Sequence, residues 1–343
     1  MVTHVSGLGT GNSLLVSGLF RTGRAADTQR EGVGMATVPL HEEIEPLKDM
    51  VPLGVINADI LPELRATPLG EPPVLSDAVE RTDHVVDEAN GVVVRVHRAV
   101  GQEGAVPCVY SIHGGGYILG SYEMDDAKFD KWCPKYGIVG VSVEYRLSPE
   151  TPYPGPLEDC YAGLKWTFEN AEELGIDQDK IGITGVSAGG GLCAALGLLA
   201  RDRGEVPLQF QLLDCPMLDD RQITPSSQLD DLLIWSRDSN AFGWQCYLGD
   251  LYGADDVPYT AAAARAEDLS GLPDAYVCIG GADGFRDEDI TYAMRLYGAG
   301  VPTELHVYPG APHGVALFSH LEIAQRYSAD QEDWLRRQLE RLG

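Results

Sequence analysis

The chain has 343 residues, of which 44% are hydrophobic, enough to bury the core of one large α/β domain or of two ordinary ones. Its 52 acidic residues outnumber its 25 basic residues, which gives a formal net charge of -27. A charge of this sign repels polyanions at long range, so nucleic acid and anionic membranes are excluded as expected partners.

The acidic composition has two interpretations. It keeps the protein soluble, or it adapts the protein to salty surroundings, where an acidic surface stays hydrated and its self-repulsion is screened. Only six of the bases are lysine, which is the observation that raises the second interpretation. The seven cysteines are an odd number, and three of them stand in apolar runs, namely Cys108, Cys215 and Cys278. We therefore expect free thiols and a cytoplasmic location.

Two segments precede the first predicted strand. Residues 1–34 lack the basic start of a secretory signal and are treated as an extension of unknown role. Residues 35–75 have a helical pattern that several prolines interrupt, which favours short helices and loops that cover a core rather than form it. No apolar stretch is long enough to predict a membrane span.

A hairpin is predicted next, in RTDHVVDEANGVVVRVHRA. Two β-rich runs flank Asn90-Gly91, a dipeptide that supplies positive φ at both centres of a tight turn. From residue 106 onward, apolar strand-like runs alternate with helix-like runs, which predicts an α/β fold with a mostly parallel, doubly wound sheet. Residues 219–262 form an insertion rich in aromatics that either lines a pocket or only fastens itself to the body.

The stretch ITGVSAGGG, residues 183–191, places Ser187 between a predicted strand and a predicted helix. A bare G-x-S-x-G is weak evidence in a chain with 40 glycines. The strand, turn and helix context is nevertheless the one that a nucleophile elbow requires. The start of the helix would also favour developing negative charge.

A nucleophilic serine needs a base and an acid that orients the base. His313 in PGAPHGV and Asp283 in IGGADGFRDE each follow a predicted strand, and the order Ser187, Asp283, His313 is the α/β-hydrolase order. Asp287 and Glu288 lie close to Asp283 in sequence and remain alternative acids. The other histidines that we considered have structural interpretations, namely His4, His41, His306 and His320.

Three glycines follow another predicted strand, in IHGGGY at residues 112–117. Such a turn allows backbone N–H groups to face a reacting carbonyl, as in an oxyanion hole. A glycine triplet alone is more often a loop, but this one lies where a hydrolase needs it.

These motifs together resemble those of the hormone-sensitive lipase family of esterases, the bacterial family IV type. The resemblance rests on HGGGY, EYRLSPETPYPGPLEDCYAGLKW, GVSAGGG, DGFRDE and HGV, and it runs from about residue 80 to the end. It implies an α/β-hydrolase fold with a mostly parallel eight-stranded sheet, helices on both faces and a helical cap. The implied cap elements are residues 35–75 and 219–262, and the implied catalytic domain is residues 76–218 and 263–343.

The resemblance also implies roles for individual residues. Ser187 is the expected nucleophile, His313 the general base and acid, and Asp283 the acid that orients it. The expected oxyanion donors are the amides of Gly115, Gly116 and Ala188, with the neighbouring Gly114 as the alternative. Bracing rather than reactive roles are implied for Glu144, Arg146, Glu150 and Asp159.

The chain departs from the family pattern at two places. Val186 precedes the nucleophile, where many members have Asp or Thr, so a polar contact is expected to be missing. Gly284-Phe285 follows the acid, where Pro-Leu is common. Neither departure removes a catalytic group.

We therefore expect a serine carboxylesterase that hydrolyses short- to medium-chain esters without a cofactor. No metal is predicted, because the CxxC and HExxH signatures of zinc sites are missing. The expected partner is a small-molecule ester, and a homodimer is left open. The alternatives are an amidase or deacetylase with the same machinery and a non-catalytic receptor, like the plant gibberellin receptors that have lost the catalytic histidine.

Overall fold

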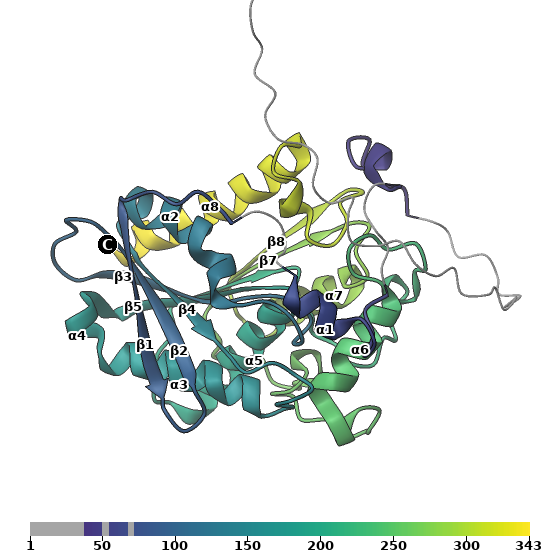
Figure 1. The fold of residues 1–343 in the computed structure, drawn as a ribbon, viewed down its shortest axis with the longest axis horizontal. Helices are drawn as coiled ribbons and strands as arrows, with labels where there is room; N and C mark the ends of the chain where they lie inside the picture. The colour runs from purple at the N-terminus through teal and green to yellow at the C-terminus, as the bar shows by residue number, and fades with distance from the viewer. Residues whose placement is uncertain (1–37, 50–54, 68–71) are drawn as a thin grey trace, which may run out of the picture.

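The computed structural model describes residues 38–49, 55–67 and 72–343 (Figure 1). The predicted N-terminal extension, 1–34, lies outside the described residues. The same is true of three pieces of the predicted cap segment, 35–37, 50–54 and 68–71.

Eight strands form one sheet, in the order β1-β2-β4-β3-β5-β6-β7-β8. The β1–β2 and β2–β4 pairs are antiparallel and every other pair is parallel. The predicted mostly parallel eight-stranded sheet is therefore confirmed. The strands are β1 (Val79–Asp87), β2 (Val92–Ala99), β3 (Val106–Ile112), β4 (Val139–Glu144), β5 (Ile176–Val186), β6 (Phe210–Asp214), β7 (Asp274–Gly280) and β8 (Thr303–Tyr308).

Helices cover both faces of the sheet (Figure 1). α2 and α8 lie on one face, and α3, α5 and α7 lie on the other. The α-helices are α1 (Leu61–Ala66), α2 (Asp126–Tyr136), α3 (Gly155–Glu169), α4 (Ala171–Leu174), α5 (Ala188–Arg203), α6 (Arg237–Leu248), α7 (Arg286–Gly298) and α8 (Glu322–Leu342). The 3-10 helices are η1 (Glu45–Leu47), η2 (Tyr122–Asp125), η3 (Ser226–Gln228), η4 (Gly249–Leu251), η5 (Ala263–Arg265) and η6 (Val315–Phe318). Among the described residues, none of the helices has the length and apolar character to cross a bilayer.

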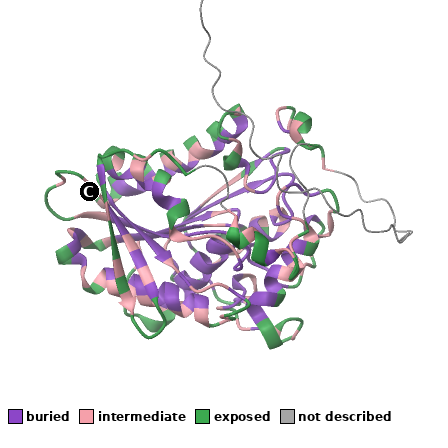
Figure 2. Ribbon diagram, in the orientation of Figure 1, coloured by how far each residue is buried: buried purple, intermediate pink, exposed green. Residues whose placement is uncertain are grey.

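The central strands are mostly apolar because their side chains enter two different cores in turn. Cys108, Tyr110 and Ile112 of β3 pack under α3 and α5, whereas Val109 between them packs under α2 and α8. This is the two-residue period of a strand that is covered on both faces. Figure 2 accordingly shows buried residues along the central strands and exposed residues on the outer surfaces of the helices.

The predicted hairpin is present as β1 and β2, but the predicted turn is wrong in detail. Residues 88–91 form a longer loop, in which Gly91 has a φ of 70° and Asn90 does not have positive φ. The Asp87 side chain accepts hydrogen bonds from the amides of Ala89 and Asn90, at 2.9 and 3.2 Å. An aspartate that bonds to the amides ahead of it stabilises such a loop, so the tight two-residue turn is not needed.

The insertion between β6 and β7 contains η3, α6 and η4. It contacts the loop that follows β3, residues 113–117, which we call the glycine loop. Tyr247 of α6 stacks on Tyr117 with their ring centroids 4.0 Å apart. Trp235, which lies just before α6, packs against Gly116. The aromatics therefore fasten the insertion, and at Trp235 they also face the candidate site described next.

Candidate active site

Ser187 occupies a single-residue turn between β5, which ends at Val186, and α5, which begins at Ala188. Its φ of 57° and ψ of -121° are unfavourable for a residue with a side chain. Two backbone hydrogen bonds hold it there, from the Ser187 amide to Asp214 O at 2.8 Å and from Met217 N to the Ser187 carbonyl at 2.9 Å. The predicted strand, turn and helix are therefore present, and the turn is strained.

Gly189 explains why the turn is rich in small residues. A Cβ at this position would clash with the backbone carbonyl oxygens of Ile112 and His113. The first turn of α5 thus lies directly against the end of β3, where the glycine loop begins. Any side chain at Gly189 would push the elbow away from that loop.

Ser187, His313 and Asp283 lie in one hydrogen-bonded row. His313 Nε2 is 2.9 Å from Ser187 Oγ, and His313 Nδ1 is 2.7 Å from Asp283 Oδ2. All three side chains are buried, with relative exposures of 7%, 6% and 2%. Because a carboxylate only accepts hydrogen bonds, Nδ1 carries the proton and Nε2 is free to accept the proton of the serine.

The two alternative acids point elsewhere. Asp287 accepts a hydrogen bond from Ser226 N at 2.7 Å. Glu288 accepts from the amides of Leu218 and Asp219, at 2.9 and 3.1 Å. Of the three acids in this segment, the structure brings Asp283 to the histidine.

The glycine loop lies beside Ser187, and its backbone is one that only glycine adopts easily. Gly115 and Gly116 have φ of 116° and 62°. In the part of the chain that the structure describes, neither of their amides donates a hydrogen bond. The Ala188 amide is the first of α5, where helix amides have no acceptor within the helix. A Cβ on Gly116 would also collide with the Trp235 ring.

A family model described as the alpha/beta hydrolase fold matches residues 109–317, which contain most of these elements. The chain belongs to this alpha/beta hydrolase family. The predicted fold family is therefore confirmed.

Several relatives of this hydrolase are named esterases. Carboxylesterase NlhH of Mycobacterium tuberculosis (strain CDC 1551 / Oshkosh) is 36% identical over 283 residues, which cover 80% of this chain and 88% of that protein. Esterase LipI of Mycobacterium tuberculosis (strain ATCC 25618 / H37Rv) is 36% identical over 61% of this chain and 65% of its own length. A solved structure titled Bacterial Heroin Esterase has a TM-score of 0.81 and 39% identity, over 88% of this chain and 98% of that chain. These similarities support the predicted class, a carboxylic ester hydrolase.

The residues with predicted bracing roles form contacts around the hydrolase site. Arg146 Nη2 and Nε donate to the two oxygens of buried Asp159, at 2.6 and 2.8 Å. Glu150 pairs with Arg65 of α1 at 2.7 Å. Arg65 Nε also donates to Ile118 O at 2.9 Å, which fixes α1 to the chain just after the glycine loop.

The two positions at which this hydrolase departs from the family pattern, Val186 and Gly284-Phe285, both lie next to residues of the site. Phe285 packs edge-on against the His313 ring, with centroids 5.1 Å apart, and its amide donates to Asp283 Oδ1 at 3.0 Å. Phe285 thus restrains both partners of the His–Asp bond. At the other departure, Val186 is a half-buried apolar residue packed against the core.

Sequence reasoning missed a group of buried acids behind Asp283. Burial and the nearby carboxylates raise the pKa of Glu288 and of Asp289 well above their usual range. Among the described residues, no group donates a hydrogen bond to either Asp289 oxygen. The only signal in the sequence is the density of acids in DGFRDED, which is equally typical of an exposed helix start.

His113, the first residue of the HGGG motif, is buried and neutral. It stacks on Tyr145 with centroids 4.2 Å apart, and its Nδ1–H donates to Gly114 O at 2.8 Å. Burial lowers the pKa of His113 from 6.5 to about 4. The positive charge that His⁺ would bring to this loop is therefore excluded near neutral pH.

Acid should consequently destabilise the hydrolase through His113. A folded-state pKa below the unfolded value means that the contribution to stability is complete above about 6.5 and is lost as the pH falls towards about 4. Between pH 7.5 and pH 5, the wild type should lose about 2 kcal/mol more unfolding free energy than His113→Asn. Urea unfolding at the two pH values measures this difference. Equal losses in the two proteins would contradict it.

Proposed function

We propose that the chain is a serine carboxylesterase that hydrolyses small esters of short- to medium-chain carboxylic acids. The observation that carries the proposal is the row from Ser187 Oγ through His313 to Asp283, at 2.9 and 2.7 Å, beside the glycine loop. This row supplies a nucleophile, a base in the correct tautomer and an acid that orients the base.

The reaction has two halves. Ser187 Oγ attacks the ester carbonyl while His313 Nε2 takes its proton, and the amides of Gly115, Gly116 and Ala188 stabilise the oxyanion. The alcohol leaves with the proton from Nε2, and an acyl-serine remains. Water then gives its proton to Nε2 and attacks the acyl carbon, after which Ser187 leaves with that proton. No cofactor is needed.

The surroundings of the site support small acyl groups. Trp235 packs against Gly116, and it also lines a small cavity with Leu232, Phe285 and Asp283. Bulky rings that close the space beside the oxyanion loop restrict a long acyl chain more than an acetyl or butyryl group. The named esterases among the relatives agree with an ester as substrate.

Hydrolysis of p-nitrophenyl esters with acyl chains of two to twelve carbons tests the proposal. We expect kcat/KM to be highest between two and six carbons and at least about tenfold lower at twelve carbons, a difference of about 1.4 kcal/mol in transition-state binding. An initial burst of p-nitrophenol would report the acyl-enzyme. Matched p-nitroanilides should react more slowly than the esters. Faster anilide hydrolysis would instead support the amidase reading, and no turnover of either series would support a non-catalytic receptor.

A further inference from the structure

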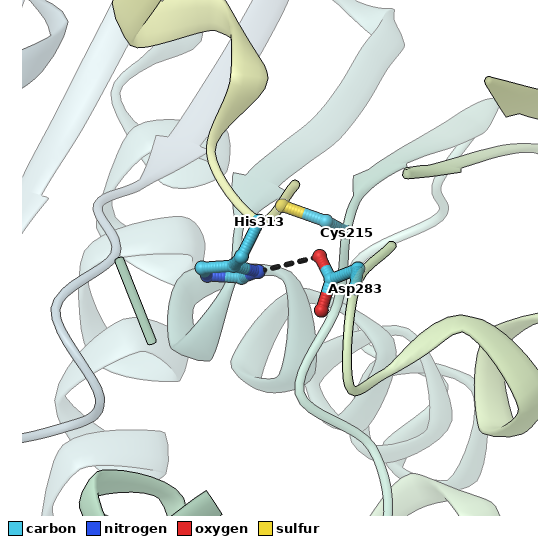
Figure 3. Close-up of side chains that lie close together, drawn as sticks. All are labelled: Cys215, Asp283 and His313. Carbon is cyan, nitrogen blue, oxygen red and sulfur yellow. Dashed lines mark hydrogen bonds and ion pairs between the residues drawn. The ribbon is translucent and has the colours of Figure 1, made fainter. Parts of the chain in front are cut away.

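Cys215 lies beside the His313–Asp283 pair, although the proposed reaction makes no use of a thiol. Its Sγ, an Asp283 carboxylate oxygen and a His313 ring nitrogen all lie within 4.8 Å of one another. Figure 3 shows the sulfur next to the hydrogen bond that joins the other two side chains. Among the residues that the structure describes, this is the one cluster of three buried groups with the donors of a metal site.

The backbone holds Cys215 in this position. It follows β6 directly, has an unusual φ of 38°, and donates from its amide to Cys278 O at 2.8 Å. A positive φ in a residue with a side chain is costly and persists only where the surrounding contacts impose it. Because Cys215 is only 2% exposed, its thiol is oriented by the fold and not by solvent.

We propose that Cys215, Asp283 and His313 form an inhibitory site for a borderline-soft divalent cation of the Zn²⁺ type. Thiolate, imidazole and carboxylate are the three ligand types that Zn²⁺ prefers, at roughly 2.0 to 2.3 Å each, so tetrahedral ligands lie roughly 3.3 to 3.7 Å apart. The Asp283–His313 separation of 2.7 Å must therefore widen slightly, and the sulfur, which lies within 4.8 Å of both partners, must come to within roughly 3.7 Å of them. Water would complete the coordination.

The ion would inhibit by reversing the tautomer of His313. Binding at Nδ1 requires the ring proton to lie on Nε2, because a metal-bound imidazole is neutral and carries its proton on the other nitrogen. Nε2 would then donate to Ser187 Oγ and could no longer accept the proton of the serine. The thiol proton is released to solvent as the Cys215–metal bond forms. The His313–Asp283 hydrogen bond is lost in the same step.

One ligand of the cluster also borders a small cavity. Asp283 lines the small cavity beneath the insertion, together with Leu232, Trp235 and Asn240. At least one of the three ligands therefore borders internal space beside the site. Inhibition should be reversible, since a chelator in excess removes an ion that is held by only three protein ligands.

Inhibition of p-nitrophenyl ester hydrolysis by Zn²⁺ tests the site. This experiment rests on the proposed function, because it measures esterase activity. Each variant is compared with its own rate without metal. Cys215→Ala should raise the half-inhibitory Zn²⁺ concentration at least about 100-fold, since even partners outside the ligand shell change affinity by about 10- to 100-fold. Cys193→Ala removes another buried thiol, one that is in α5 and outside the cluster, and should leave the inhibition unchanged. Equal inhibition of wild type and Cys215→Ala would overturn the proposal.

A binding measurement separates this proposal from the proposed function. Cd²⁺ is added to Ser187→Ala, which needs no activity, and the ultraviolet absorption of a Cd–thiolate bond is followed to saturation. One Cd²⁺ per chain is expected, and the absorption should be absent in the double variant Ser187→Ala/Cys215→Ala. Cys215→Ser, which keeps the shape of the side chain, replaces Cys215→Ala if the alanine variant does not fold. A Cd–thiolate signal that persists in the double variant would overturn the assignment of Cys215, whether or not the chain hydrolyses esters.

Discussion

Ser187→Ala is expected to lower kcat for p-nitrophenyl acetate by about 10⁶, the scale seen when a triad serine is removed. The alanine removes the oxygen that is proposed to form the acyl-enzyme, and it leaves His313 Nε2, now 2.9 Å from that oxygen, without its proton donor. KM should change little, because the amides proposed as the oxyanion hole and the other residues around the site remain. Steady-state kinetics with the acetyl ester measures both quantities.

The matched control is Ser142→Ala, which removes a fully buried serine hydroxyl from β4, a strand separated by β3 from the strand that leads to Ser187. In the described part of the chain this hydroxyl has no hydrogen-bond partner, so its loss leaves no group unpaired. Its kcat should stay within about twofold of wild type. If Ser187→Ala also kept its activity, the strained turn would be a structural feature and the proposed nucleophile would be wrong.

Much of the fold could be predicted because strong local patterns agree with it. The runs that form β3, β6 and β7 are mostly apolar on both faces, and that pattern is typical of parallel strands covered on both sides. The elbow could be predicted for a similar reason, since the strand, the turn and the helix are all neighbours of Ser187 in sequence. The local sequence predicted the wrong turn in the hairpin. The Asn90-Gly91 dipeptide predicts a tight two-residue turn, whereas the side chain of Asp87 stabilises a longer loop.

Features that depend on two distant segments could not be predicted. The contact of Trp235 with Gly116 joins the insertion to the glycine loop, and the proximity of Cys215 to His313 joins the ends of two strands. Neither pair has a spacing that a motif could report. The strained φ of Cys215 likewise has no signature, because the surrounding fold imposes it rather than the residue type.

Which of three nearby acids contacts His313 depends on packing and could not be predicted from sequence position. Asp283, Asp287 and Glu288 lie within six residues, but Asp287 and Glu288 are in the first turn of α7. Consecutive side chains on a helix point about 100° apart, so these two cannot both face one partner. Asp287 bonds to η3 and Glu288 bonds to the chain after β6, whereas Asp283 precedes the helix and faces His313.

Asp283→Asn is accordingly expected to lower kcat by about 10⁴, while Asp287→Asn stays within about tenfold of wild type. The amide has nearly the shape of the carboxylate, so the fold should survive. Its NH₂ group, however, would donate towards Nδ1 and favour the tautomer with the proton on Nε2, which cannot act as a base towards Ser187. The rate should recover partly at high pH, where hydroxide can take the serine proton in place of His313. A kcat that falls for Asp287→Asn and not for Asp283→Asn would assign the orienting role to the helix acid, against the 2.7 Å bond that now supports Asp283.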